Sequence, residues 1–400
     1  MIALGKILNP LTNASHTRDR TTSPPNSQCY PHTREGVVDY VCRWVKSSVK
    51  TTPAHVLWLY GYVGCGKSAI AQTIAEHVAK GGRLGGSFFF FRADGERRRI
   101  WKLPVTLAHQ LSVTIPQTSR LIRKAVEDDP GLLVPGAISI DVQMRRLVYE
   151  PFNASVSYLA TTLWGPYLII IDGLDECEDH EQVESFIDGL LSFFQANPNT
   201  PLRFLITSRV EEHIRQRLQT DMVVLTNLAD HAADADIETF LRMLFADEAK
   251  RNRVIQSYGS SWPSQEQLKQ LVEHVGGSFI FASTFARYIV GRPDADIRLE
   301  ESPLAQAQFP DDCLTPMDRL ELALNINPGL DGLYAHTLSR AEHFPHFPDI
   351  LAALAMFEWP LSIEKLSHFV GADKYKITGV LVRLQVIIQV PGDDITPVTF

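Results

Sequence analysis

The sequence predicts an α/β fold in which helices cover both faces of a doubly wound parallel sheet. Five short and almost wholly apolar runs occur, at residues 55–61, 85–93, 167–173, 202–209 and 222–228. Strands that are buried on both faces have this composition. The segments between the runs, such as SAIAQTIAEHVAK and EQVESFIDGLLSFFQAN, repeat their apolar residues with helical spacing. We therefore expect an α/β domain over residues 28–228.

The composition is that of an ordinary globular protein. Of the 400 residues, 45% are hydrophobic and 21% are charged, which suffices for the cores of two or three domains. The net charge of −8 gives no general attraction to DNA or to an anionic membrane surface. No apolar run approaches the ~20 residues that a membrane helix needs. The five cysteines are scattered and form no CxxC pair, which predicts reduced thiols and a cytoplasmic location.

The two ends of the chain differ from its centre. Residues 1–27 are rich in Ser, Thr, Asn and Pro, and we expect a disordered tail. Residues 229–345 are predicted to form a helical domain, with helices at IETFLRMLFADEAK, EQLKQLVEHV and SPLAQAQ. Residues 346–400 show three helical segments followed by VIIQV and ITPVTF on either side of PGDD. This order predicts a winged helix.

A phosphate-binding loop follows the first predicted strand. Residues 61–68, GYVGCGKS, match GxxxxGK[ST], with a strand before them and a helix after them. The backbone N–H groups of such a loop surround phosphates, the lysine reaches the β- and γ-phosphates, and the hydroxyl binds Mg²⁺. Ser68 is thus a predicted magnesium ligand. The predicted nucleotide-binding residues here are Gly61, Gly64, Cys65, Gly66, Lys67, Ser68 and Ala69.

A second motif, YLIIIDGLDE, supplies acidic residues. A buried strand that ends in Asp172 brings a carboxylate to the metal facing the loop, the role called Walker B. GGSFFFFRA lies between the two motifs in the chain, so we expect a further strand between the P-loop strand and the Asp172 strand in the sheet. Gly173 stands where many fast ATPases have a catalytic Glu. The candidate catalytic acids are therefore Asp175 and Glu176, and we expect slow hydrolysis.

Arginines occur in two places near these motifs. Arg209 ends the run LRFLITSR, and ligands of open α/β sheets bind at the carboxyl ends of strands, so we expect Arg209 to point towards the γ-phosphate. The run Arg97–Arg98–Arg99 is expected to be a solvated loop. The chain has no NKxD motif for guanine, which favours ATP over GTP.

These segments resemble a known family. WLYGYVGCGKSAIAQTIAE, YLIIIDGLDECED and PLRFLITSRVEEHIR are similar to the NACHT domains of fungal NOD-like proteins, which belong to the STAND P-loop NTPases and are similar to the nephrocystin-3 amino-terminal P-loop. The likeness extends over about residues 28–400. It implies an ATP-operated signalling switch that is closed with ADP and self-associates through the NACHT domain with ATP, in fungal self/non-self recognition or programmed cell death. It further places Thr33 and Arg34 beside adenine.

The sequence departs from that family at both ends. Relatives commonly carry an amino-terminal effector domain and carboxyl-terminal repeats, and we expect neither from the residues of this sequence. Their winged helix continues into a His that contacts ADP, whereas this sequence stops at Phe400. We therefore expect an incomplete winged helix, as in a truncated paralogue, and poor discrimination between ADP and ATP.

Other functions fit the same motifs less well. The main alternative is a nucleotide-binding assembly module that does not hydrolyse ATP. A small-molecule kinase shares the P-loop but lacks the DGLDE segment and the long helical region. A DNA-binding winged helix is disfavoured because residues 349–400 hold six acids and four bases. The expected ligands are ATP or ADP with Mg²⁺, and the expected partner is a second copy of the chain.

Overall fold

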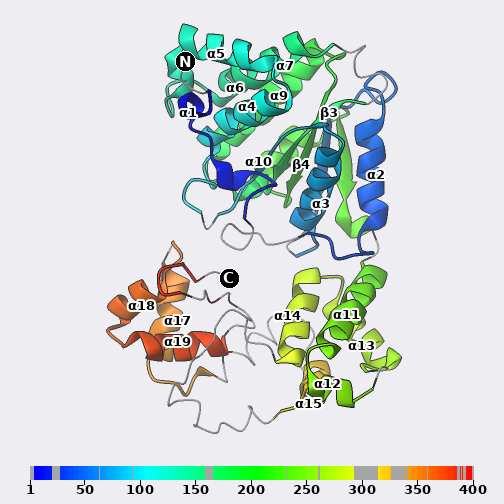
Figure 1. Ribbon diagram of the computed structural model, residues 1–400, viewed down its shortest axis with the longest axis vertical. Coiled ribbons are helices and arrows are strands. Elements are labelled where there is room, and N and C mark those ends of the chain that lie inside the picture. The colour runs from blue at the N-terminus through cyan, green and yellow to red at the C-terminus, as the bar shows by residue number, and fades with distance from the viewer. Residues whose placement is uncertain are drawn as a thin grey trace. The chain divides into compact units, whose positions relative to one another are not determined.

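The computed structural model describes most of the chain. The described residues are 4–19, 28–62, 64–92, 94–157, 165–231, 233–259, 262–291, 314–325, 338, 341–357, 359–384, 388, 390 and 393–398. Their contacts divide the chain into two compact units, residues 1–231 and 232–400 (Figure 1). Each unit is described by itself below.

The first unit contains a five-stranded sheet in which every pair of neighbouring strands is parallel. The order across the sheet is β2-β3-β4-β1-β5. The strands are β1 (Val56–Tyr60), β2 (Leu84–Phe89), β3 (Tyr167–Asp172), β4 (Leu202–Ser208) and β5 (Val223–Asn227). Four of them lie within the predicted apolar runs, and β2 begins one residue before the run at 85–93. The predicted fold class is thus confirmed.

The order of the strands corrects one detail of the prediction. A strand does separate β1 from β3, but it is β4, whereas β2 (the GGSFFFFRA segment) lies at the edge beyond β3. The reason is that β2 and β3 are joined through several helices, and such a connection lets a strand pair on either side of its neighbour. Position in the chain therefore does not fix position in the sheet.

Helices cover both faces of this sheet, as Figure 1 shows. Alternate residues of a strand point to opposite faces, so Leu57 and Leu59 join one apolar cluster while Val56 and Trp58 join the other. The first cluster includes residues of α2 (Glu35–Lys46) and α3 (Lys67–Lys80). The second is covered by α4 (Leu103–Thr114), α5 (Thr118–Asp128), α6 (Ile140–Met144), α7 (Glu150–Ser155), α9 (His180–Ala196) and α10 (Glu212–Leu218).

The amino-terminal residues that were predicted to be disordered are in part folded. Residues 4–19 include helix α1 (Leu4–Leu8) and a 3-10 turn, η1 (Thr12–Ala14). The side chains of Leu8 and Ala14 are 2% and 0% exposed and belong to the core under α4. The prediction was wrong for these residues because a few of their apolar side chains are buried in a hydrophobic core that is formed mainly by other segments. Residues 1–3 and 20–27 lie outside the described residues.

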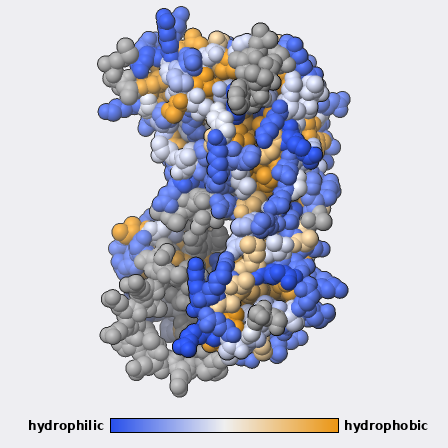
Figure 2. All heavy atoms as spheres, turned by 45° about the vertical axis from the view of Figure 1, so that its right-hand side comes forward, coloured by the Kyte–Doolittle hydropathy of each residue, from blue (hydrophilic) through white to orange (hydrophobic). Residues whose placement is uncertain are grey.

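The second unit is helical. One core joins α11 (Asp234–Ala249), α12 (Arg253–Ser257), α13 (Gln265–Val275), α14 (Phe279–Val290) and α15 (Pro316–Asn325). Local sequence sets the ends of α13, where Ser264 and Gln267 form a capping box and Gly276 ends the helix in the left-handed conformation. The predicted helix SPLAQAQ lies outside the described residues. On the face of the molecule in Figure 2, hydrophilic residues predominate between smaller hydrophobic areas.

The last three helices, α17 (Phe347–Met356), α18 (Ile363–Val370) and α19 (Lys374–Arg383), share another core. They coincide with the three helical segments of the predicted winged helix. Part of its predicted hairpin lies outside the described residues. Of the hairpin residues that are described, Pro397 forms an isolated antiparallel bridge with Ser362. The winged helix therefore stays a prediction. Among the helices of the described segments, none combines the length and the apolar content needed to cross a bilayer.

A substitution in α1 tests whether the amino-terminal segment is folded. Leu8→Ala is expected to lower the free energy of unfolding by about 2–4 kcal/mol, because it removes a buried side chain and leaves a cavity. Leu121→Ala, at a side chain that is 36% exposed, is the control and should change it by less than about 1 kcal/mol. Urea unfolding, followed by tryptophan fluorescence, measures both. Equal midpoints for Leu8→Ala and the wild type would mean that the segment is not docked in solution.

Candidate nucleotide-binding site

The loop between β1 and α3 has the backbone of an anion-binding site. Gly66 precedes α3 with a φ of +94°, and its position has no side-chain cap. The first N–H groups of α3, which have no partner within the helix, thus face the loop. At Gly61, a Cβ would lie 2.9 Å from the Cys65 sulfur, so only glycine lets the loop close over this buried thiol. The predicted P-loop geometry is present.

Lys67 bends back over the same loop. Its Nζ donates hydrogen bonds to the carbonyl oxygens of Gly61 at 2.9 Å and Tyr62 at 2.8 Å. These acceptors are neutral, and phosphate oxygens form shorter and stronger hydrogen bonds with an ammonium group. The lysine charge therefore already lies at the loop where phosphates would bind.

Asp172 presents a buried carboxylate at the end of β3. Its Oδ1 accepts a hydrogen bond of 2.5 Å from the Thr207 hydroxyl, whose oxygen accepts another from the Gly173 N–H at 3.1 Å. Burial raises the pKa of Asp172, while the hydroxyls of Thr207 and Ser68 act to lower it. Its Oδ2 is buried and has no hydrogen-bond partner among the described residues. Thr207 thus fixes one oxygen of the carboxylate and leaves the other for a ligand.

A magnesium ion fits this pair of residues. Mg²⁺ prefers carboxylate and other oxygen ligands and usually binds one or two protein groups together with substrate phosphates. The unpartnered Asp172 oxygen and the Ser68 hydroxyl at the start of α3 provide such oxygens. Ser68 and Asp172 are the residues that would hold Mg²⁺, and their role as metal ligands stays a prediction.

Asp175 and Arg209 form an ion pair. Asp175 Oδ1 accepts from the Arg209 backbone N–H at 2.9 Å, and its Oδ2 accepts from Arg209 Nε at 2.6 Å. The Asp175 side chain is 4% exposed, against 36% for Arg209. The hydrogen bond to Asp175 is the main reason that the pKa of Arg209 is raised. Because both of its oxygens are engaged, Asp175 positions Arg209 here and is not placed to activate water.

Glu176 is better suited to proton transfer. Its Oε2 accepts a hydrogen bond from the Arg92 backbone N–H at 2.9 Å. Burial raises the pKa of Glu176 to about 7, and the nearby charges of Asp175 and Asp172 act in the same direction. A carboxyl group with a pKa near neutrality can both accept and release a proton at physiological pH. Of the two candidate acids, Glu176 is the one that the structure favours.

The loop after β2 holds this acidic segment in place. The Phe90 N–H donates to the Asp172 carbonyl at 2.9 Å, and Arg98 Nη1 donates to Glu178 Oε1 at 2.6 Å. Arg99 pairs with Asp179 at 3.3 Å between Nη1 and Oδ1. Two loops that are far apart in the chain thus fix each other at the carboxyl edge of the sheet.

The same contacts correct the prediction of a solvated arginine run. Arg97 and Arg98 are 0% and 3% exposed, whereas the Arg99 side chain is 44% exposed. Arg97 Nε donates to the Phe89 carbonyl at 3.0 Å, and burial lowers the pKa of Arg97 to about 10, so it remains charged at neutral pH. The prediction was wrong for Arg97 and Arg98 because their partners belong to segments that only the fold brings near.

Arg34 lies beside the P-loop, and Thr33 precedes it in the chain. Arg34 is 3% exposed, and its Nη2 donates to the Cys65 carbonyl at 3.0 Å while its Nη1 donates to the His231 carbonyl at 3.2 Å. The Thr33 hydroxyl donates to the Tyr30 carbonyl at 2.7 Å and closes a turn before α2. Arg34 therefore supports the loop through its backbone, while the adenine contact stays a prediction for both residues.

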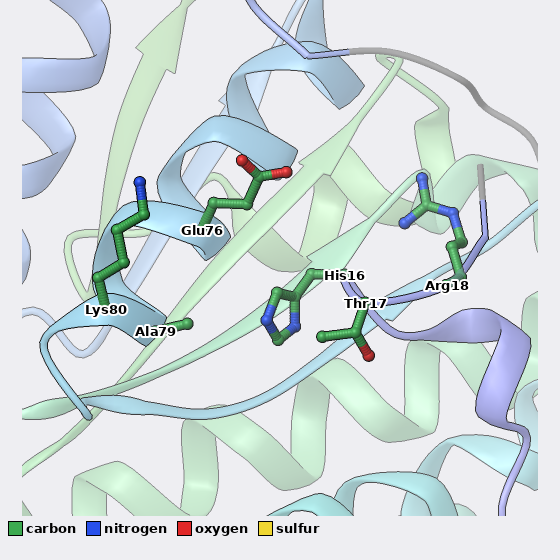
Figure 3. Close-up of a pocket in the computed structure, with 6 residues that line it drawn as sticks. All are labelled: His16, Thr17, Arg18, Glu76, Ala79 and Lys80. Atoms are coloured by element: carbon green, nitrogen blue, oxygen red, sulfur yellow. The ribbon is translucent and has the colours of Figure 1, made fainter.

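Sequence reasoning missed one residue close to the site. Arg18, in the segment that was predicted to be disordered, is 6% exposed and donates from Nη1 to Gln72 Oε1 on α3 at 3.1 Å. It also borders a cavity of about 520 Å³ that is lined by His16, Thr17, Arg18, Glu76, Ala79 and Lys80. In Figure 3 its side chain lies apart from those of Glu76 and Lys80. Its basic charge is the only signal in the sequence that could have pointed to it.

The raised pKa of Glu176 predicts a pH dependence of stability. The pKa of Glu176 is about 7 in the folded protein and 4.5 ordinarily. Its contribution to the free energy of unfolding is therefore complete below pH 4.5 and is lost as the pH rises through 7. Glu176→Gln should remove this loss. The unfolding free energy of the variant relative to wild type should thus rise between pH 5 and pH 8, by up to about 3 kcal/mol. Urea unfolding at both pH values measures it, and parallel pH profiles would contradict the assigned pKa.

A comparison with known protein families gives one match to the domain that carries this site. The family model described as nephrocystin 3, N-terminal, matches residues 39–209, which contain the P-loop, Asp172 and Arg209. A comparison with curated protein sequences gives no match. The matched segment is less than half of the chain, so the likeness applies to the domain that carries the site.

Solved structures give weak likenesses. PCH-2 of C. elegans has a TM-score of 0.38 and 13% identity, over 73% of this chain and 69% of that chain. A Walker-type ATPase of Pyrococcus abyssi has a TM-score of 0.42 and 13% identity, over 94% and 96%. Domain III of the Thermotoga maritima replication initiation protein DnaA has a TM-score of 0.34 and 12% identity, over 67% and 89%. With its parallel sheet, its P-loop and the family match, the first unit of this chain is a nucleotide-binding P-loop NTPase domain.

Proposed function

We propose that the protein is an ATP-binding signalling switch of the NACHT and STAND class, with slow ATP hydrolysis. The observation that carries this proposal is the pairing of a complete P-loop with a buried Asp172 oxygen that has no hydrogen-bond partner in the described structure. ATP and Mg²⁺ would occupy a site that has a lysine, a hydroxyl and a carboxylate on its walls. The resemblance of the three motifs to fungal NACHT domains supports the class, and with it a role in self/non-self recognition or programmed cell death.

Each residue has a distinct part in the proposed reaction. Lys67 binds the phosphates, and Ser68 and Asp172 hold the metal, which lowers the charge on the phosphates when it is bound. Thr207 orients Asp172 through the 2.5 Å hydrogen bond. Glu176 accepts a proton from the attacking water. Its pKa of about 7 leaves it partly protonated at neutral pH, which supports slow turnover.

The ion pair of Arg209 with Asp175 supports a role in switching. Both groups follow strands that end at the nucleotide site, and the Arg209 side chain keeps 36% of its surface exposed. The γ-phosphate of ATP would compete with Asp175 for the guanidinium, and ADP has no such group. Because a ligand shifts a conformational equilibrium only through a difference in affinity, this competition would couple the nucleotide to the position of Arg209. We propose that the ATP state then self-associates through the NACHT domain.

A nucleotide-binding assembly module without hydrolysis is the second candidate. It is favoured by Gly173 after Asp172 and by the engagement of both Asp175 oxygens with Arg209. In either case we propose a cytoplasmic location, since Cys42, Cys65 and Cys177 are buried thiols outside any disulfide.

Lys67→Ala tests nucleotide binding. It should weaken ATP binding by at least about 1.5–3 kcal/mol, the range for hydrogen bonds to a charged group. Lys124→Ala, at an exposed position on α5, is the control and should bind as the wild type does. Isothermal calorimetry measures the affinities. Equal affinities for wild type and Lys67→Ala would show that the loop does not bind ATP.

Glu176→Gln separates the two candidates. We expect wild-type turnover well below the ~10 s⁻¹ median of enzymes. The turnover of Glu176→Gln should be at least about tenfold lower than that of the wild type, because the substitution removes the proton acceptor. Its affinity for ATP should be unchanged. Glu184→Gln, on α9 in a surface ion pair with Arg217, is the control. Phosphate release under steady state measures turnover. A wild type that binds ATP without any turnover would favour the assembly module.

A further inference from the structure

The amino-terminal arm, which we define as residues 4–18, is docked along the edge of the P-loop domain. The Leu11 N–H donates to the Thr106 hydroxyl at 2.9 Å, and Lys102 Nζ donates to the Asn9 carbonyl at 2.8 Å. Further along, the His16 N–H donates to the Ser87 hydroxyl on β2 at 2.9 Å. The arm therefore follows edge strand β2, and it lies outside the segment that matches the nephrocystin family model.

The arm reaches α3 at its end. The Gln72 side-chain amide donates to the His16 carbonyl at 2.8 Å, and its Oε1 accepts from Arg18 Nη1 at 3.1 Å. Gln72 is fully buried. It lies one helical turn after Ser68 on the same face of α3. Arg18 is thereby fixed one turn away from the hydroxyl that would bind Mg²⁺.

The sheet brings Arg18 close to Asp172. The Arg18 guanidinium carbon lies 4.0 Å from the centre of the Phe89 ring, and Phe89 is paired in register with Asp172 across β2 and β3. The positive charges of Arg18 and Lys67 both act to lower the pKa of Asp172. Two cations from unrelated segments thus lie near enough to the same carboxylate for their charges to act on it.

We propose that Arg18 is a further nucleotide-binding residue, which contacts the terminal phosphate of a nucleoside triphosphate. This inference rests on the proposed function. A guanidinium group bonds phosphate oxygens through several donors, and it lies here on the metal side of the site. The contact needs the third phosphate, so Arg18 favours ATP over ADP. The arm therefore makes the nucleotide preference depend on residues that precede the domain in the chain.

Arg18→Met in the full chain tests this inference. The apolar side chain keeps the bulk against Phe89 and removes the charge. We expect about tenfold or more weaker binding of a non-hydrolysable ATP analogue with Mg²⁺, and less than about threefold weaker binding of ADP. Arg18→Lys should lie between wild type and Arg18→Met. The control Asn13→Ala removes the arm's 3.1 Å hydrogen bond to Asp94 Oδ2 but keeps Arg18, and it should preserve both affinities. Calorimetry gives the affinities, and thermal unfolding reports the fold of each variant.

Several results would overturn the inference. Equal affinities of wild type and Arg18→Met for the analogue would do so, and so would equal losses for the analogue and ADP. If Arg18→Met does not fold, Arg18→Lys decides: an unchanged preference for the analogue over ADP contradicts the contact. A wild type that binds neither nucleotide refutes the proposed function itself. A wild type that binds both and loses both in Lys67→Ala confirms the site, so that only the role of Arg18 remains in question.

Discussion

The burial of the Asp172 carboxylate at the carboxyl end of β3 is the constraint on which the rest of the site depends. A buried carboxylate is costly unless hydrogen bonds or positive charges compensate it. In this protein, β4 brings the Thr207 hydroxyl to one oxygen, and Lys67 and Arg18 bring positive charge. Strand order is what makes this arrangement work, because β4 lies between β1 and β3. The P-loop and the acid therefore meet across a strand that carries the supporting hydroxyl.

A second layer of contacts fixes the loops around this carboxylate. The loop after β2 binds the loop after β3 through Arg92, Arg98 and Arg99, so that Glu176 is held by a backbone N–H. The ion pair of Asp175 with Arg209 then joins the loop after β3 to the end of β4. Three neighbouring strands thus end in loops that are tied together, and a ligand that displaces Arg209 would act on all of them.

Local sequence patterns predicted the residue types of the site, but they did not predict several of the contacts that these residues make. GYVGCGKS and YLIIIDGLDE predicted the P-loop, Asp172 and the pair of candidate acids, because each motif lies next to an apolar strand. The sequence could not separate Asp175 from Glu176, since the difference arises from Arg209, which follows β4 and binds Asp175. Arg97 and Arg98 were predicted to be exposed because a run of charges is normally solvated. In the structure, Arg97 donates a hydrogen bond to the Phe89 carbonyl and Arg98 donates one to the Glu178 carboxylate.

The sequence by itself determined the fold class, the five strands and the residues of the phosphate-binding loop. These features depend on periodicity and on the backbone freedom of glycine, which are local properties. Only the tertiary structure decided that β2 lies at the edge, that the pKa of Glu176 is raised, and that residues 4–18 dock beside the P-loop domain. Each of these depends on partners distant in the chain. Burial of an arm with few apolar residues, and the pKa of a carboxyl group, are set by neighbours that no local pattern encodes.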